Sequence, residues 1–152
     1  MSKTVSDVMT LNARTISRHG SVVEAAKTML DEDVGSVPVL DDDGMLCGIV
    51  TDRDIALRVV AAGRDPQTTR VEDIATTDPH CASPDESLDD AYERMTTWRI
   101  RRLPVCDGDR LVGMLAQADL VHELKDKKAG QLVEEISQPG QPAYANHSVG
   151  ID

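Results

Sequence analysis

Residues 48–54 read Gly48-Ile49-Val50-Thr51-Asp52-Arg53-Asp54, and residues 113–119 read Gly113-Met114-Leu115-Ala116-Gln117-Ala118-Asp119. Both stretches open with a glycine and two apolar residues and close with an aspartate. Upstream, the two copies match at a constant offset of 66 residues, at Asp7 and Asp73, Ser21 and Ser87, Ala25 and Ala91, Met29 and Met95, Val34 and Ile100, Val37 and Leu103, and Pro38 and Pro104. Duplicated units of this size pack against each other. We therefore expect any ligand site to lie between two similar halves.

Apolar periodicity predicts the order helix, strand, helix, strand, strand, helix in each copy. The first copy is expected to form a strand at residues 13–17, a helix from Ser21 with Glu24 completing a capping box, strands at 36–40 and 45–50, and a helix over 51–62. The second is expected to form a helix from Ser87, strands at 103–106 and 111–115, and a helix from Gln117 through Leu124, which Gly130 breaks before a short amphipathic turn over 132–136. Pro38 and Pro104 cannot donate to a strand ladder, so they mark strand starts or edges.

These elements predict a mixed α/β (α+β) fold of two domains, residues 8–66 and 74–131, followed by a flexible tail over 138–152. Each half is marginal alone by its surface-to-volume ratio, so we expect one cooperative pair. The net charge of −11 repels phosphate backbones and anionic lipid, which argues against nucleic acid or membrane partners. The sequence has no apolar run of transmembrane length and no signal peptide at its start, so a cytoplasmic protein is expected.

The residues that bind metals or perform acid–base catalysis are scattered. Cys47, Cys81 and Cys106 form no CxxC pair and no Cys/His cluster, and Cys47 and Cys106 are expected to be reduced thiols buried in strands. The run from Asp41 to Gly44 is typical of a hairpin turn and lacks the alternating ligands of a calcium loop. The histidines show no metal-type pairing. Neither a metal site nor an enzyme is therefore expected.

Thr51 and Asp54 have two interpretations. A hydroxyl followed three residues later by a carboxylate is a variant of the capping box, which only stabilises a helix start. The same pair at a strand end could bind a ligand, because a helix N-terminus attracts phosphate and a carboxylate there can accept both ribose hydroxyls. The second copy has Ala116 in place of the hydroxyl but keeps Asp119, which favours a ligand role for both aspartates.

The duplicated pattern resembles a pair of CBS domains (cystathionine beta-synthase domains, a Bateman module). The resemblance rests on residues 5–10, on residues 34–39 (Val-Gly-Ser-Val-Pro-Val), on Gly48 to Asp54, and on residues 101–105 and 113–119 of the second copy. It covers residues 5 to about 130 and is most similar to the stand-alone bacterial proteins that consist of one CBS pair.

The resemblance implies two β-α-β-β-α units related by a pseudo-two-fold axis, with two clefts between them and a disk-shaped homodimer. It also implies a regulatory ligand, AMP, ADP, ATP or S-adenosylmethionine, with no obligatory cofactor. By this resemblance Asp54 and Asp119 hold ribose, Thr51 helps to hold phosphate or ribose, and the first strand and the proline-bearing strand, represented by Thr15, Val37 and Pro38, enclose the adenine. Because Ala116 replaces the hydroxyl, the two clefts are expected to be inequivalent, with the one at Thr51 and Asp54 the better candidate.

Residues 98–102 (Trp-Arg-Ile-Arg-Arg) form a concentrated positive patch in this acidic chain. Arg101 or Arg102 could pair bidentately with phosphate in a cleft, or the patch could be a solvated face that balances nearby carboxylates. The leading hypothesis is a non-enzymatic adenosine-ligand sensor that signals to an unidentified effector protein. The alternative is an interaction module that binds no nucleotide and whose clefts are filled by side chains.

Overall fold

The computed structural model describes the backbone of residues 3–135 and the side chains of residues 3–126. The first copy consists of α1 (Val5–Val8), β1 (Ile16–Ser17), α2 (Val22–Glu32), β2 (Ser36–Leu40), β3 (Leu46–Thr51), α3 (Asp52–Ile55) and the π-helical turn η1 (Ala56–Val60). The second consists of the 3-10 turn η2 (Val71–Asp73), β4 (Thr76–Thr77), α4 (Leu88–Trp98), β5 (Arg102–Asp107), β6 (Arg110–Ala116) and α5 (Gln117–Glu135). The mixed α/β fold of tandem repeats is confirmed, and the expected tail at 138–152 lies outside the described residues.

The two long helices of the repeat start and stop in the same way. Helix α2 begins at the predicted capping box, where the Glu24 amide donates to Ser21 Oγ at 3.1 Å and the Ser21 amide donates to the Glu24 carboxylate at 3.3 Å. It ends at Asp33, whose φ of 56° is left-handed, and α4 ends in the same conformation at Arg99. The buried stripe of each helix repeats every three to four residues, which turns one face toward the sheet of its own half.

The final helices differ from the prediction. The helix expected over 51–62 is regular only through Ile55 and continues as the π-helical turn Ala56–Val60. The predicted break at Gly130 is wrong, because α5 runs without interruption to Glu135. One glycine inside a helix costs about 1 kcal/mol, which the hydrogen bonds on either side can offset.

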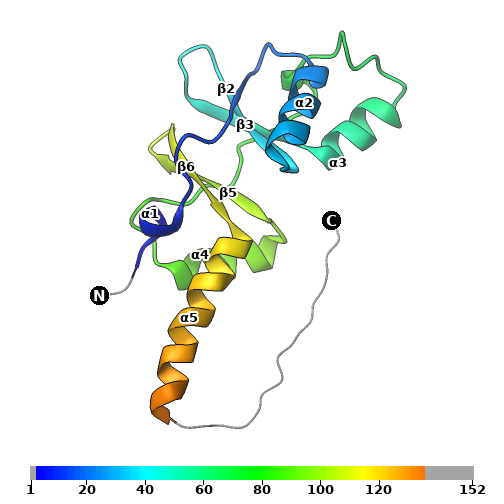
Figure 1. Ribbon diagram of the computed structural model, residues 1–152. Coiled ribbons are helices and arrows are strands. Elements are labelled where there is room, and N and C mark those ends of the chain that lie inside the picture. The colour runs from blue at the N-terminus through cyan, green and yellow to red at the C-terminus, as the bar shows by residue number, and fades with distance from the viewer. Residues whose placement is uncertain (1–2, 136–152) are drawn as a thin grey trace.

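Each half contains a β-hairpin. Strands β2 and β3 form the hairpin of a four-stranded sheet, in which β1 pairs with β2 in parallel and β4 pairs with β3 antiparallel. Strands β5 and β6 form the second hairpin. Ala82 bridges Val105 in parallel, as Ile16 pairs with Val39 in the first half. The two halves are therefore built alike, and Figure 1 shows them one above the other.

The two copies exchange their first residues, which we call the lead segments (residues 5–11 and 71–77). Strand β4 belongs to the lead segment of the second copy but pairs with β3 of the first half. Reciprocally, the Thr10 amide donates to the Met114 carbonyl at 2.8 Å, and the Met114 amide donates to the Thr10 carbonyl at 3.0 Å, so Thr10 extends the hairpin of the second half. Figure 1 shows the consequence, because α1, the first helix in the chain, lies beside the lower half. Each sheet thus takes one of its edges from the other copy.

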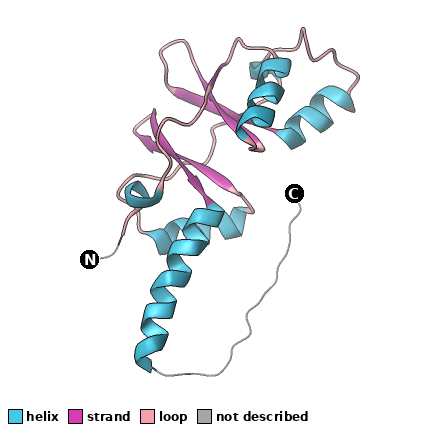
Figure 2. Cartoon of the chain, in the orientation of Figure 1, coloured by secondary structure: helices cyan, strands magenta, loops and turns pink. Residues whose placement is uncertain are grey.

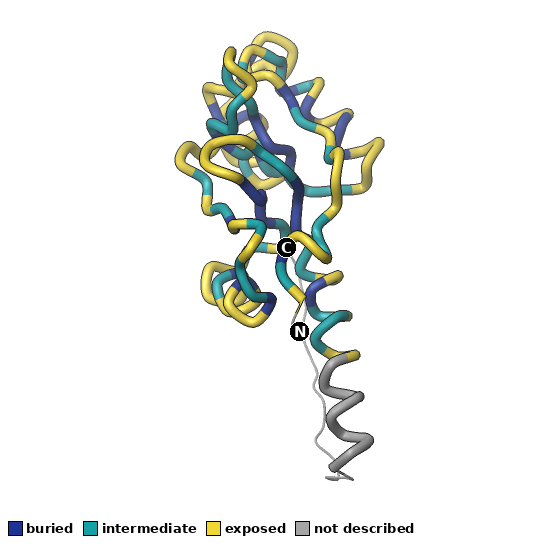
Figure 3. Tube along the Cα trace, turned by 90° about the vertical axis from the view of Figure 1, so that its left-hand side faces the viewer, coloured by how far each residue is buried: buried dark blue, intermediate teal, exposed yellow. Residues whose placement is uncertain are grey.

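The exchange extends into the cores. Val5 is fully buried in the core of the second half, and Val71, its repeat equivalent, is fully buried in the core of the first. The Val5 amide donates to the Glu86 carbonyl at 2.9 Å, and the Val71 amide donates to the Gly20 carbonyl at 2.8 Å. Figure 3 shows buried residues in both the upper and the lower half of the molecule. The domain limits of 8–66 and 74–131 stay a prediction from the repeat along the chain, whereas the packed halves share their lead segments.

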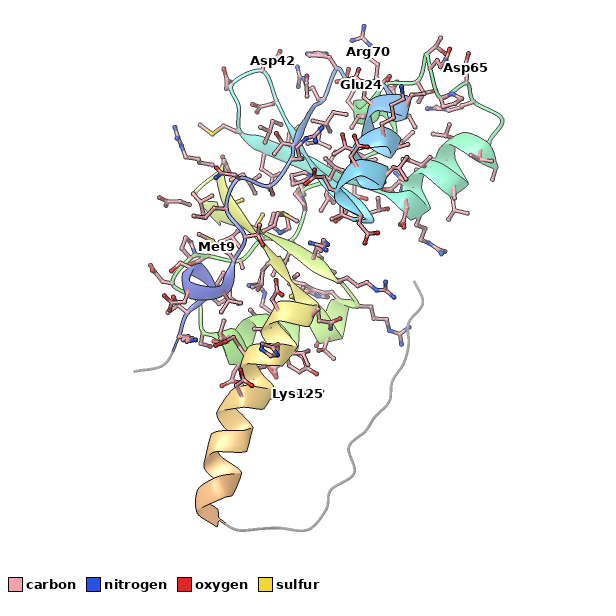
Figure 4. All side chains as sticks on the ribbon, viewed as in Figure 1. Met9, Glu24, Asp42, Asp65, Arg70 and Lys125 are labelled. Atoms are coloured by element: carbon pink, nitrogen blue, oxygen red, sulfur yellow. The ribbon has the colours of Figure 1, made fainter. Side chains whose placement is uncertain are left out.

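The glycines that open the two diagnostic stretches make room for the exchanged segments. A Cβ on Gly48 would lie 2.8 Å from the Thr76 carbonyl oxygen. A Cβ on Gly113 would lie 2.6 Å from Met9 Sδ and 3.1 Å from the Thr10 carbonyl oxygen. Figure 4 labels Met9 beside α1, at the border between this helix and the second hairpin. Both glycines are thus explained by packing, since the backbone of the other copy passes where a side chain would stand.

Candidate ligand cleft

A cavity of about 1240 Å³ lies between the two halves. Its walls come from the start of β2, the end of β3, the segment after β4, the start of β5 and the first turn of α5. Figure 2 shows the hairpin strands of both halves in the middle of the molecule, with the long helices α2, α4 and α5 further out. The volume exceeds that of most small-ligand pockets, which hold about 300–1,000 Å³. It is therefore large enough for a nucleotide-sized ligand.

The cavity is more positive than the chain that surrounds it. In the described part of the chain, its cationic lining residues are Arg53, Arg99, Arg101 and Arg102, and its acidic lining residues are Asp33, Asp52 and Asp78. The chain as a whole carries a net charge of −11. An excess of arginine in a cleft of an acidic protein favours an anionic ligand, because guanidinium groups pair bidentately with phosphate or carboxylate.

Backbone hydrogen bonds hold both strand ends in the cavity wall. The Asp52 amide donates to the Gly35 carbonyl at 2.9 Å, and in the second copy the Gln117 amide donates to the Arg101 carbonyl at 2.8 Å. A Cβ on Gly35 would lie 2.9 Å from Asp52 Oδ2, so a larger residue here would require the exposed Asp52 side chain to turn away. The second copy has Arg101 at this position, next to the first turn of α5. Arg101 and the first turn of α5 line the same cavity, and a guanidinium and a helix N-terminus both attract anions.

Thr51 and Asp54 form the capping box. The Thr51 amide donates to Asp54 Oδ2 at 3.0 Å, and the Asp54 amide donates to Thr51 Oγ1 at 3.0 Å. Thr51 also lines the cavity, whereas Asp54 is half-buried and lies outside the lining. Because the Thr51 oxygen serves as acceptor in the cap, its hydroxyl hydrogen can still donate to a ligand. Asp54 contributes one carboxylate oxygen to the cap and keeps the other for a second partner.

The other predicted site residues divide into two groups. Arg101 and Arg102 line the cavity beside Thr51. The remaining predicted residues lie outside the lining: Asp119 is exposed on α5, Thr15 is half-buried, and Val37 and Pro38 are buried in the first half. Pro104, the repeat equivalent of Pro38, does line the cavity. The structure therefore brings Thr51 together with second-copy residues.

The segment from Thr76 to His80 forms a wall that sequence reasoning missed. The His80 ring stacks on Trp98 with centroids 3.6 Å apart and planes inclined by 14°. Arg94 covers Trp98, with its Cζ 5.1 Å from the ring centroid. His80 corresponds to Arg14 in the first copy, so the repeat contained no signal for this stack. Residues 10–14, the equivalents of this wall, are not in the lining, which makes the cavity asymmetric.

The described part of the chain holds neither a metal-binding cluster nor a membrane-crossing helix. No group of three or more His, Cys, Asp or Glu in residues 3–126 is arranged to hold a metal ion. Within residues 3–135, no helix combines the length and apolarity that crossing a bilayer requires.

Two intertwined α/β repeats around a shared, arginine-lined cleft define a tandem-repeat module. The CBS domain family matches the chain twice, over residues 5–61 and 71–126, so the chain belongs to the CBS domain family and contains a CBS pair. It is similar to the CBS domain-containing protein YhcV of Bacillus subtilis, with 42% identity over 134 residues that cover 88% of this chain and 94% of YhcV. CBS pairs of this kind are regulatory modules.

Two solved structures similar to this one contain adenosine compounds. CBSX2 from Arabidopsis thaliana, solved in complex with AMP, has a TM-score of 0.71 and 28% identity over 83% of this chain and 98% of that chain. The CBS domain pair of protein MJ0100, solved with 5'-methylthioadenosine and S-adenosyl-L-methionine, has a TM-score of 0.74 and 28% identity over 84% of this chain and 99% of that chain. Adenosine compounds therefore bind to proteins of this fold.

Proposed function

We propose that this protein is a regulatory CBS pair that binds an adenosine ligand in the cavity between its halves and signals the bound state to a partner protein. The candidate ligands are AMP, ADP, ATP and S-adenosylmethionine. Support comes from the AMP complex of CBSX2 and the S-adenosyl-L-methionine complex of MJ0100. The proposal assigns no reaction to the protein.

The observation that carries the proposal is the convergence of anion-binding groups on one cavity. Arg101, Arg102, the first turn of α5 and the Thr51 hydroxyl all belong to its walls. Guanidinium groups and free helix amides are the groups that proteins use to bind phosphate. Apolar side chains such as Ile49, Val121 and Pro104 supply a surface for a base. The phosphates of a nucleotide would then lie at the arginines and its base against the apolar wall.

Titration calorimetry with AMP, ADP, ATP and S-adenosylmethionine tests this proposal. Arg102→Ala is expected to weaken ATP binding by about tenfold, since a hydrogen bond to a charged group contributes about 1.5–3 kcal/mol. The matched control is Arg110→Ala, which removes an exposed arginine of β6 outside the cavity. If none of the four compounds binds at millimolar concentration, the proposal fails. An equal loss of ATP affinity in both variants would show that binding depends on the overall charge of the protein and not on the cavity.

The capping box favours a second candidate, the interaction module that binds no nucleotide. Thr51 and Asp54 already satisfy each other's backbone amides, so their presence needs no ligand to explain it. The distinguishing variant is Asp54→Ala in the same titration. A ribose contact predicts weaker nucleotide binding, whereas a purely structural cap predicts a less stable protein with unchanged affinity.

The homodimer expected from the family is also part of the proposal. Leu30 on α2 and Leu57 and Val60 on the first half's last helix are 79%, 51% and 72% exposed. Three large apolar side chains on neighbouring helices favour burial against another chain. A bound ligand would then change signalling by shifting how the halves or the two chains pack, to the extent that its affinity differs between the two arrangements.

A further inference from the structure

The three cysteines of the chain line one small cavity. This second cavity, of about 220 Å³, lies between the two hairpins and includes Cys47 of β3, Cys106 of β5 and Cys81 of the segment before α4. The hairpins touch here, since the Leu46 amide donates to the Asp109 carbonyl at 2.9 Å. The sequence, in which the three cysteines are far apart, contains no hint of this gathering. All three are free thiols.

Two of the three sulfurs are in contact. The Cys106 thiol donates to Cys81 Sγ at 3.5 Å, and the Cys81 thiol donates to the Pro79 carbonyl oxygen at 3.5 Å. The backbones beside them are tied together, because the Ala82 amide donates to the Pro104 carbonyl at 2.8 Å and the Cys106 amide donates to the Ala82 carbonyl at 2.9 Å. A disulfide requires about 2.05 Å between sulfurs, so closing the bond must bring the Cys81 and Cys106 sulfurs nearer than they are in the reduced protein.

We propose that Cys81 and Cys106 form an oxidation site, which a small peroxide converts reversibly into an intramolecular disulfide. The Cys81 sulfur attacks one peroxide oxygen, the O–O bond breaks, and water leaves, so Cys81 becomes a sulfenic acid. The Cys106 sulfur then attacks the Cys81 sulfur, and the S–O bond breaks with loss of a second water. In total, two thiols and one hydrogen peroxide give one disulfide and two waters. A dithiol returns the site to its reduced state by exchange.

The environments of the two thiols set the order of the steps. Burial raises the pKa of the Cys106 thiol to about 12, and the adjacent Cys81 adds to this shift. Cys106 is only 7% exposed, whereas Cys81 is half-buried. Cys81 therefore reacts first, because its exposure gives the peroxide access, whereas burial disfavours the nucleophilic thiolate of Cys106. Burial also raises the pKa of Cys47 in the first half, with Asp41 adding to the shift. We therefore expect Cys47 to react slowly with peroxide.

The oxidation site adjoins the candidate ligand cleft. Asp78 and Pro79 line both cavities, so they form the partition between them. A disulfide removes the hydrogen that Cys81 donates to the Pro79 carbonyl, and it draws Cys81 toward β5. Arg94 donates to the Cys81 carbonyl and pairs with Glu86, which limits how far that backbone can follow. Formation of the disulfide is therefore expected to shift the partition, Asp78 and Pro79. The further expectation, that oxidation changes ligand affinity in the cleft, rests on the proposed function.

Intact mass and peptide mapping of the full chain test the disulfide itself. Reduced protein treated with hydrogen peroxide is expected to lose about 2 Da, with the link mapped to Cys81 and Cys106. Cys47→Ser, the matched control, is expected to behave like the unchanged protein. Cys106→Ser is expected to stop at a Cys81 sulfenic acid that dimedone traps. Loss of the link in Cys47→Ser, a disulfide between chains, or oxidation of Cys81 without a link would each overturn the proposal.

Trp98, the only tryptophan of the chain, reports on the partition without any nucleotide. It stacks on His80, next to Cys81, and lies against Arg94, which binds the Cys81 carbonyl. Its fluorescence is expected to shift on oxidation, to return with dithiothreitol, and to stay constant in Cys81→Ser and Cys106→Ser. A constant spectrum in the oxidised unchanged protein would refute the coupling to the cleft. Because no nucleotide is used, a failure of the proposed ligand function leaves both readouts unaffected.

Discussion

At the scale of single residues, the two aspartates that close the diagnostic stretches have different surroundings. Asp54 is bound into a capping box with Thr51, and Asp119 is exposed on α5 without that threonine. The sequence left the choice between cap and ligand open, and the structure shows that the cap exists. The cap does not exclude a ligand role for Asp54, because only one of its two carboxylate oxygens accepts from the Thr51 amide.

The capping geometry predicts unequal effects on stability. Asp54→Ala removes the carboxylate that accepts from the Thr51 amide, and it is expected to lower the free energy of unfolding by about 1 kcal/mol. Asp119→Ala is expected to change it by less than about 0.5 kcal/mol, as for an exposed surface residue. Urea unfolding followed by circular dichroism measures both values. Equal losses would show that Asp119 has a structural role as well.

The two motif glycines also predict unequal effects. Gly48→Ala would place a methyl group against the Thr76 backbone carbonyl, which cannot move without breaking the β3–β4 pairing. Gly113→Ala would meet the Met9 side chain first, which can change rotamer. Overpacking of this kind costs about 1–3 kcal/mol, with Gly48→Ala expected at the upper end and Gly113→Ala at the lower. Thermal unfolding of the two variants side by side checks the order, and a reversed order would contradict the packing described for β4.

At the scale of helices and strands, the lead segments are the least predictable part of the fold. Apolar periodicity predicted the hairpins and long helices, because their patterns are local. The pairing of β4 with β3, and of Thr10 with Met114, was not predicted. A short strand has the same sequence pattern whether it pairs with its own copy or with the other one. For the same reason, the wall from Thr76 to His80 was missed, since it reaches the cavity only because of the exchange.

Val5 and Val71 test the exchange as a matched pair. Each is fully buried in the core of the opposite half, so Val5→Ala and Val71→Ala are each expected to lower the free energy of unfolding by about 2 kcal/mol. Amide hydrogen exchange locates the loss: Val5→Ala should weaken protection first in β5 and β6, and Val71→Ala in β2 and β3. If each variant loosened its own copy instead, the exchanged arrangement would be wrong.

At the scale of the whole molecule, two separate cores are held in one unit. Each core contains apolar side chains from both copies, so neither can form completely while the other copy is unfolded. The sequence predicted one cooperative pair from the small size of each half. The structure adds a stronger reason, because the halves share strands as well as a surface.

Calorimetry is expected to show one unfolding transition in which the calorimetric and van't Hoff enthalpies agree. A ligand that bridges the halves should raise the transition temperature without splitting the peak, because it binds only the folded pair. Two resolved transitions, or a calorimetric enthalpy well above the van't Hoff enthalpy, would mean that the halves unfold independently despite the exchanged lead segments.

The exchanged lead segments also bear on how such a chain could arise by duplication. A polypeptide with a single copy would present one hairpin without its neighbouring strand and one lead segment without a core to enter. A second identical chain would correct both defects at once, since each lead segment would fit the other chain's hairpin across a true two-fold axis. Joining two such chains through residues 64–70 would keep every contact and release the two copies from being identical. Differences such as Thr51 against Ala116, or Gly35 against Arg101, could accumulate only after that fusion.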